Sequence, residues 1–211
     1  MIDNLYRNFP RGRHYLVRQQ EPGEIDAIIS KGLFTHLQRG RKRNLWGELA
    51  GQLPEWGRKI GWVPDNFPLV FFSETVTGEI AGTLAATNNR IRATRHELRR
   101  AAVLLRQMEL TDLSRRNPFQ LSQGETKLVW FLCQWAKTPE YLIMGHVPTS
   151  LSTRRAAHLV TFLKNESRAA AANTTFPTLI LGYSPGDQQW YRGLLTENYW
   201  TDMEASVLDG I

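Results

Sequence analysis

A predicted helix begins with the run Leu121-Ser122-Gln123-Gly124-Glu125 and continues to Ala136. Ser122 is a favourable N-cap residue, and Gly124 lets a ligand approach the backbone closely because it carries no side chain. The positive end of a helix behind these two residues would form an anion site. Taken alone, such a run is more often the start of an ordinary capped helix, so the segments around it decide between the two interpretations.

Strand and helix patterns lie on both sides of this run. Two apolar runs of the buried-strand type, Tyr141–Met144 and Thr178–Leu181, are separated by a predicted helix near residues 152–170. Because a strand, a helix and a second strand at this spacing form a βαβ unit, we expect a parallel sheet. Lys59–Pro64 is also strand-like, and Arg95–Leu110 has the periodicity of a helix. These patterns predict the α/β class with a helical insertion.

The helix predicted over Arg95–Leu110 is amphipathic. Its apolar residues recur at three- and four-residue spacing, which indicates packing against the core or a subdomain rather than a cofactor site. We expect five residues in this stripe: Leu98, Ala101, Ala102, Leu105 and Met108. Five arginines lie mostly opposite the stripe, at positions 92, 95, 99, 100 and 106.

The order and spacing of these segments resemble the pattern of the ATP-binding-cassette (ABC) ATPases. In that family an LSGGQ signature opens a helix, and a Walker B strand follows with the continuation Asp-Glu-Pro-Thr-Ser-x-Leu-Asp. Here Gly145–Ser152 follows Tyr141–Met144 in that place. Upstream, Ile60–Asn66 looks like the Q-loop segment, and Phe71–Ala81 is most similar to cassettes of energy-coupling-factor transporters, which take up cobalt and vitamins. The resemblance runs from about residue 45 to about residue 185.

The resemblance implies a fold and a domain organisation. The fold would be a P-loop NTPase-like (RecA-like) parallel sheet core with the α-helical subdomain of ABC proteins. Residues 1–64 and 139–211 would form the nucleotide-binding core, and residues 65–138 would form the helical subdomain with the signature helix.

The chain departs from the family at the phosphate-binding loop. Counting back from Leu49-Ala50-Gly51 places Lys42 at the phosphate lysine, within Leu37–Asn44 instead of Gly-x-Ser-Gly-x-Gly-Lys-Ser-Thr. The loop needs glycines because its backbone N–H groups must converge on the phosphates. Arg43 replaces the hydroxyl that binds magnesium, which puts a cation where a cation should bind. We therefore expect no metal at this chain's own site.

Five further positions depart from the residues that hydrolyse ATP in the family. Asp65 stands at the Q-loop glutamine, Gly145 at the Walker B aspartate and His146 at the catalytic glutamate. Ser152 stands at the D-loop aspartate, and Tyr183 stands at the switch histidine. His146 could act as a base, but it would have no magnesium carboxylate or phosphate loop beside it. The sequence predicts that ATP hydrolysis at the chain's own site is absent or very weak.

The signature run is retained in part, as Ser122, Gln123, Gly124 and Glu125. In the family, the signature of one subunit closes over ATP held by the other. The resemblance thus implies an inactive subunit in a hetero- or homodimer with an active ABC ATPase, sharing the partner's ATP and serving a membrane transporter or another membrane complex. A pseudo-ATPase scaffold without a nucleotide role is the alternative, which Ser152 favours because the D-loop aspartate normally organises the dimer interface.

The resemblance also points to an aromatic surface. In related cassettes the stretch after the Q-loop faces the membrane subunit, and here that region contains Trp62, Phe71 and Phe72. The two adjacent phenylalanines predict a partner groove, whereas core packing is the simpler interpretation for at least one of them. If both rings are buried within the chain, the groove hypothesis fails.

Composition limits the possible functions. The 211 residues include 42% hydrophobic and 22% charged residues, as in an ordinary globular protein, and no apolar run approaches a membrane span. With no apolar leader and a single cysteine, Cys133, we expect a cytoplasmic protein held on the inner face of a membrane through its partners. The net charge is +6, and Arg39–Arg43 is its densest cluster. That cluster is either a phosphate or nucleic-acid contact or a solvated basic face; without zinc spacing or interleaved aromatic residues, nucleic acid is not an expected partner.

Overall fold

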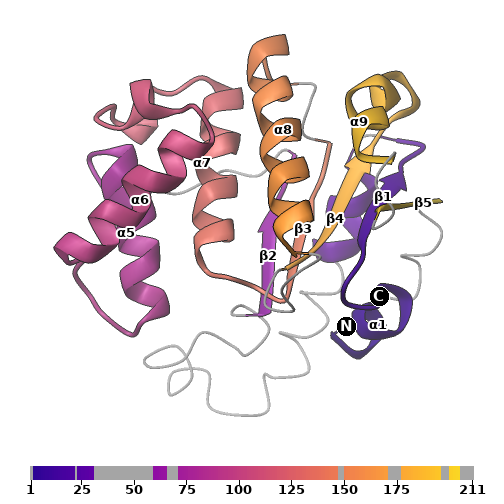
Figure 1. The fold of residues 1–211 in the computed structure, drawn as a ribbon, viewed down its shortest axis with the longest axis horizontal. Coiled ribbons are helices and arrows are strands. Elements are labelled where there is room, and N and C mark those ends of the chain that lie inside the picture. Colours follow the sequence, from indigo (N-terminus) through magenta and orange to yellow (C-terminus); the bar gives the residue numbers. More distant parts are fainter. Residues whose placement is uncertain are drawn as a thin grey trace.

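The computed structural model describes residues 2–21, 23–30, 59–65, 71–146, 150–170, 177–195 and 200–204. Within these ranges five strands form one sheet in the order β2-β3-β4-β1-β5, and all four strand pairs are parallel (Figure 1). The strands are β1 (His14–Arg18), β2 (Ile60–Val63), β3 (Tyr141–Met144), β4 (Thr178–Tyr183) and β5 (Trp200–Glu204). The parallel sheet and the α/β class predicted from the sequence are confirmed.

Helices precede, connect and follow these strands. The α-helices are α1 (Ile2–Asn8), α5 (Val76–Thr87), α6 (Arg95–Gln107), α7 (Gln123–Ala136), α8 (Thr153–Ala170) and α9 (Gln188–Leu195), and residues 24–30 are also helical. The short 3-10 helices are η1 (Thr111–Leu113), η2 (Pro118–Gln120) and η4 (Pro185–Asp187). None of the helices in the described ranges is long and apolar enough to cross a bilayer.

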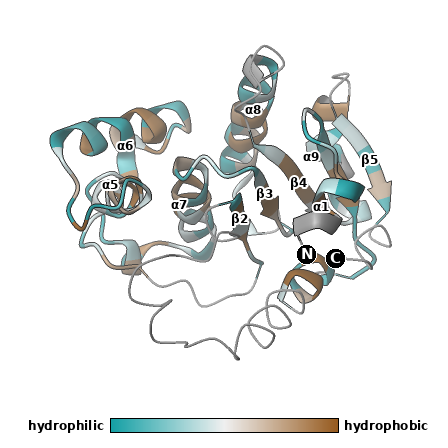
Figure 2. Ribbon diagram, turned by 90° about the horizontal axis from the view of Figure 1, so that it is seen from below, coloured by the Kyte–Doolittle hydropathy of each residue, from teal (hydrophilic) through white to brown (hydrophobic). Residues whose placement is uncertain are grey.

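Alternate residues of each strand point to opposite faces of the sheet, and helices bury both faces. Leu16, Leu142 and Leu179 pack with α7, α8 and α9 on one face. Residues of β1, β3 and β4 that point the other way pack with α1 and with the helix over residues 24–30. The central residues of β3 and β4 are coloured as apolar (Figure 2).

The helices α5 and α6 pack against one another at one side of the molecule, and α5 also contacts α7 (Figure 1). All five strands belong to residues 1–64 and 139–211, and the described residues between 71 and 138 form α-helices, 3-10 helices and their connections. The division into a core and a helical subdomain stays a prediction. α7 contacts β2 as well as α5, and so it connects the two parts.

The stripe predicted on α6 is partly wrong. Ala101, Leu105 and Met108 are buried as expected, but Leu98 is 41% exposed and Ala102 is exposed. The helix buries a narrower face than its apolar residues would allow, centred on Ala101 and Leu105. The five arginines opposite the stripe are all exposed.

Candidate functional site

The carboxyl ends of β2 and β3 lie side by side, because these strands pair in parallel with Val63 opposite Met144. Ligand sites in open α/β sheets lie beyond the carboxyl ends of the strands. Asp65 follows β2, and Gly145 and His146 follow β3. Three positions that the sequence places at the Q-loop and Walker B therefore lie together.

A buried ion pair fills the space between these segments. Lys127 reaches in from α7, and its Nζ lies 3.1 Å from Asp65 Oδ1. The two side chains are 6% and 8% exposed. Lys127 Nζ also donates to the carbonyl of His146 at 3.3 Å, and the His146 N–H donates to Asp65 Oδ2 at 2.7 Å. Asp65 is therefore held by charge and by hydrogen bonds from two segments.

A second carboxylate continues this network on the helix over residues 24–30. Asp26 Oδ2 accepts the backbone N–H of Asp65 at 2.5 Å, and its Oδ1 accepts Trp62 Nε1 at 3.0 Å. Burial raises the pKa of Asp26, and the nearby Asp65 charge acts in the same direction. The segments after β2 and β3 are thereby connected to α7 and to the helix over residues 24–30 through charged side chains.

Gly145 has no room for a side chain. A Cβ at this position would lie 2.8 Å from Asp65 Oδ2 and 2.9 Å from its carboxyl carbon. Distances under 3 Å require one of the groups to move, and Asp65 is fixed by Lys127 and the His146 N–H. A carboxylate at the Walker B position would therefore collide with the carboxylate that follows β2.

His146 and Tyr183 point to different partners. The His146 ring contacts the Asp187 carboxylate of η4 through Nε2. Tyr183, predicted at the switch histidine, donates its hydroxyl to both oxygens of Asp202 in β5, at 2.8 and 3.0 Å. Burial and this hydrogen bond raise the pKa of Tyr183 to about 12. The residue after β4 that meets His146 is thus Asp187, which the sequence reasoning missed.

β1 begins a strand–loop–helix unit of the kind that holds phosphates in P-loop proteins. The run from 19 to 24 reads Gln-Gln-Glu-Pro-Gly-Glu and contains no lysine. Gln19 is fully buried, and its Oε1 accepts the N–H of Ile25 at 3.2 Å; the Gln20 N–H donates to Glu24 Oε2 at 2.9 Å. The start of the helix is therefore bonded to the chain's own side chains. Lys42 and Arg43 lie outside the described residues.

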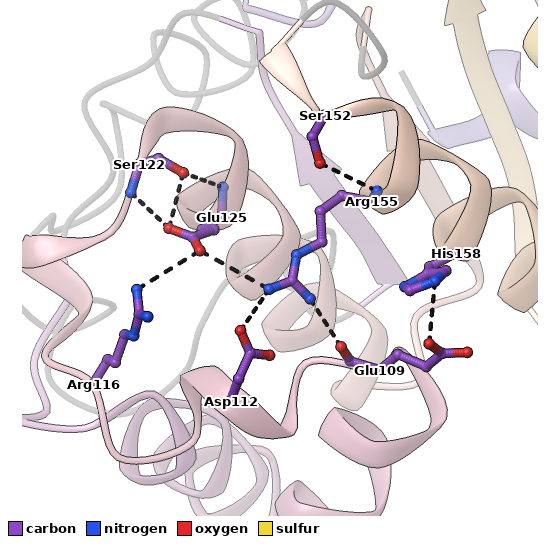
Figure 3. Close-up of polar contacts among 8 residues, drawn as sticks. All are labelled: Glu109, Asp112, Arg116, Ser122, Glu125, Ser152, Arg155 and His158. Carbon is purple, nitrogen blue, oxygen red and sulfur yellow. Dashed lines mark hydrogen bonds and ion pairs between the residues drawn. The ribbon is translucent and has the colours of Figure 1, made fainter.

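The signature residues lie at the start of α7, where Ser122 and Gln123 are exposed. Ser122 and Glu125 form a capping box: the Ser122 N–H and hydroxyl donate to Glu125 Oε2 at 3.0 and 2.9 Å, and the Glu125 N–H donates to Ser122 Oγ at 3.4 Å (Figure 3). Gly124 is buried, and a Cβ there would lie 2.2 Å from the carbonyl oxygen of Ser150. Gly124 thus permits close packing between α7 and the segment before α8.

Arg155 of α8 lies beside this capping box (Figure 3). Its guanidinium donates to the carbonyl of Glu109 and to Asp112 Oδ2, both at 2.8 Å, and lies 4.0 Å from Glu125 Oε1. Arg155 therefore ties α8 to the segment after α6 and approaches the start of α7. Ser152, predicted at the D-loop aspartate, accepts the N–H of Arg155 at 3.4 Å at the start of α8.

Sequence reasoning missed Lys127, Asp26, Asp187 and Arg155 as members of this site. One signal was present for Lys127, because it lies three residues after Gly124 and four before Phe131 on the buried side of α7. A lysine on a buried helix face requires an anionic partner. The other three residues carry no comparable signal in the sequence.

The two adjacent phenylalanines of the predicted groove differ in their exposure. Phe71 is buried, with ring centroids 6.2 Å from Trp130, whereas Phe72 is 89% exposed. Phe72 lines a groove of about 480 Å³ together with Ile91, Trp130 and Lys137. The carboxylate of Glu79 accepts the Phe72 N–H at 2.9 Å, which holds the Phe72 backbone at the groove. Because one of the two rings is not buried, the groove prediction stands.

The thiol of Cys133 is buried. Burial raises its pKa to about 12, so the thiolate is not formed near neutral pH.

Comparison with solved structures gives the fold a family context. The dimeric structure of a post-hydrolysis state of the ATP-binding cassette MJ0796, bound to ADP and Pi, aligns with 82% of this chain and 75% of its own, with a TM-score of 0.56 and 17% identity. The fold is that of an ABC ATPase. At this identity the likeness concerns the fold alone.

Sequence comparison agrees with that fold. No protein-family model matches the chain. A protein of Pyrococcus horikoshii named "Putative ABC transporter ATP-binding protein" is 29% identical over 56% of this chain and 44% of its own length. The methionine import ATP-binding protein MetN 3 of Oceanobacillus iheyensis is 32% identical over 56% of this chain and 34% of its own. The chain thus resembles ATP-binding proteins of ABC transporters over less than half the length of these relatives.

Proposed function

We propose that this chain is a non-catalytic homologue of ABC transporter ATP-binding subunits, which pairs with an active ABC ATPase in a membrane transport complex. The observation that carries this proposal is the buried network of Asp65, Lys127 and His146, in which Asp65 and His146 stand at the positions predicted for the Q-loop glutamine and the catalytic glutamate. The low-level similarity to ATP-binding proteins of ABC transporters supports the transport setting. The energy-coupling-factor type is part of this proposal and rests on the similarity of residues 71–81 alone.

ATP and magnesium are the ligands that the family implies, and the described residues at the chain's own site do not fit them. Magnesium requires oxygen ligands, but Asp65 is bound to Lys127 and the place of the Walker B carboxylate is taken by Gly145. Asp26 adds a second negative group beside Asp65, where a phosphate would be repelled. These contacts support a site that neither binds Mg·ATP tightly nor hydrolyses it.

The signature at the start of α7 would serve ATP held by a partner rather than ATP at the chain's own site. The exposed position of Ser122 and Gln123 at the start of α7 supports the proposal that they contact ATP held by a partner. A helix start favours an anion, and α7 begins at Gln123. In this arrangement Ser122 and Glu125 shape the helix start, and Gly124 lets it pack beside Ser150.

The groove beside Phe72 supports a membrane subunit as the second partner. Phe72 is 89% exposed and Ile91 fully exposed, although both are large and apolar. Exposed apolar groups at a groove indicate a binding surface for another protein. We assign the groove to an apolar segment of the membrane subunit, which would hold this chain on the inner face of the membrane.

A scaffold without any nucleotide role is the second candidate. It is favoured by the internal use of the signature residues: Ser122 caps α7 together with Glu125, and Gly124 is needed for packing against Ser150. These two roles give a scaffold reasons to keep both residues. Gln123, which is exposed and takes no part in the capping box, is the residue that separates the two candidates.

The test uses the complex isolated from the native source together with its co-purifying proteins. Under the proposal, an active ABC ATPase co-purifies, and Gln123→Arg abolishes ATP turnover by the complex because a bulky side chain enters the shared site. The matched control is Gln120→Arg, at an exposed position of η2 just before the signature. Unchanged turnover with Gln123→Arg would favour the scaffold, and the absence of any ABC ATPase among the co-purifying proteins would contradict both the pairing and the donation.

A further inference from the structure

The outer face of α6 presents a row of arginines. Arg95, Arg99 and Arg106 lie on one side of the helix, since their spacings of four and seven residues return to the same face. Ala101 and Leu105 lie on other sides of the helix and are buried, and α6 packs against α5. Arg92 and Arg100 flank the row, and all five side chains are exposed.

Within the part of the chain that the structure describes, none of these five arginines forms an ion pair. The acidic residues nearby are bonded to other side chains. Glu97 pairs with Arg90 at 3.1 Å, Asp112 with Arg155 at 2.8 Å, and Glu109 with His158 at 3.1 Å. The row is therefore an uncompensated positive surface, and a surface of this kind attracts a polyanion.

Aliphatic side chains are interspersed with this charge. Val103 is 42% exposed within the row, Leu98 is 41% exposed beside it, and Ile91 is fully exposed just before the helix. Leu98, Ala102 and Leu105 also line a hollow of about 390 Å³, to which Arg115 contributes a further cation. Apolar groups gain little from a phosphate backbone in water, and nucleic-acid surfaces use aromatic side chains to stack on bases. Arginines mixed with aliphatic groups instead match the interface of an anionic bilayer.

We propose that the outer face of α6 binds anionic phospholipid. Arg95, Arg99 and Arg106 contact the headgroup phosphates, and Val103 and Leu98 enter the boundary between headgroups and acyl chains. Each arginine near an anionic membrane surface strengthens binding by roughly fivefold. This binding does not depend on nucleotide chemistry at either site, so it can hold or fail independently of the proposed function.

The experiment measures co-sedimentation of the full chain with vesicles. One set is pure phosphatidylcholine and the other contains about 30 mol % phosphatidylserine, at about 0.1 M salt. The test variant is Arg95→Gln/Arg99→Gln/Arg106→Gln. The control removes the same charge from other exposed arginines, as Arg7→Gln/Arg13→Gln/Arg192→Gln. Since all six side chains are exposed, both variants should keep the wild-type melting temperature.

The wild-type chain should bind the anionic vesicles and not the neutral ones. The α6 variant should bind roughly a hundredfold more weakly, and the control variant should lose far less. In the wild-type background, Val103→Ser should also weaken binding to the anionic vesicles, although it leaves the charge unchanged. Failure of the wild-type chain to bind, or equal losses in the two triple variants, would overturn the proposal. Tighter binding to duplex DNA than to the vesicles at the same salt would replace lipid with nucleic acid.

Discussion

The Asp65 carboxylate fills the space that a side chain at position 145 would need, at the end of β3. In the family that the chain resembles, the residue at position 145 is an aspartate that holds magnesium. Here the carboxylate comes from the neighbouring strand end instead, and it is neutralised by Lys127 rather than by a metal. Under the proposed function, this internal ion pair stands in place of a ligand site.

Replacement of Gly145 by alanine tests how tightly this volume is filled. The new Cβ would lie 2.8 Å from Asp65 Oδ2, so Gly145→Ala should lower the free energy of unfolding by about 1–3 kcal/mol. Gly186→Ala is the matched control, because a Cβ there has nothing within 4 Å. Urea denaturation of both variants measures the difference. Equal stability of the two variants would show that Asp65 is free to move away.

Removal of Lys127 tests the ion pair itself. Lys127→Met leaves Asp65 buried without its cation, and this should cost roughly 3–5 kcal/mol of the free energy of unfolding. The double variant Lys127→Met/Asp65→Asn removes both charges, so it should recover much of that loss. A double-mutant cycle in urea gives the coupling energy between the two side chains. A coupling energy near zero would mean that the pair does not contribute to stability.

The residues of this network could not have been predicted together from the sequence. Lys127 and Asp65 are 62 positions apart, and Asp26 and Asp65 are 39 apart. Spacing along the chain identifies partners within one helix or strand, but these contacts depend on the order of strands in the sheet. The sequence indicates that Asp65, Gly145 and His146 depart from the ABC pattern. It does not indicate that these residues meet in one network with Lys127.

At the scale of elements, the two helices α6 and α7 begin in the same way. Thr94 and Glu97 form a capping box at the start of α6, as Ser122 and Glu125 do at the start of α7. The spacing of a serine or threonine three residues before a glutamate is readable in a sequence. Both helix starts are therefore determined locally.

The capping box of α6 predicts a dependence of stability on pH. Hydrogen bonds from Thr94, with help from Arg90, lower the pKa of Glu97 to about 2. Because the folded pKa lies below the unfolded one, this stabilisation is present above about pH 4.5 and is lost as the pH falls toward 2. Glu97→Gln should lower the melting temperature near pH 7 and have little effect near pH 2.

The control for this prediction is Glu74→Gln, which changes an exposed glutamate that forms no ion pair within the described residues. Melting temperatures of both variants and of the wild-type chain are recorded by circular dichroism between pH 2 and pH 7. A deficit of Glu97→Gln that stays constant across this range would contradict the role of the ionised carboxylate.

Periodicity predicted the elements well and their contacts less well. β3, α8 and β4 follow the predicted strand–helix–strand unit because buried strands and an amphipathic helix have distinct apolar spacing. On α6 the same spacing placed Leu98 and Ala102 in the core, where the structure has them exposed. The sequence records which residues are apolar, but the width of the buried face depends on α5.

At the scale of the whole molecule, the fold offers a second position for the phosphate loop, directly after β1. Alignment placed Lys42 at the phosphate lysine, and that residue lies outside the described ranges. The strand–loop–helix unit at β1 is a second candidate, with Gln19 and the residues up to Glu24 in the loop. The loop after β1 has no lysine, and the start of its helix is bonded to Gln19. A phosphate site there would be weak, as the sequence also predicts for the placement at Lys42.

Titration of Mg·ATP into the purified chain by isothermal calorimetry is the most direct test of the filled site. With Asp65 bound to Lys127 and no carboxylate at position 145, we predict no saturable heat up to about 1 mM nucleotide and no rise in melting temperature. A ligand at a hundred times its Kd would stabilise the chain by about 2.7 kcal/mol, which is easily detected. Saturable binding in the micromolar range, with turnover on the order of 1 s⁻¹ that Lys42→Ala abolishes, would contradict the proposal that this chain is catalytically inactive.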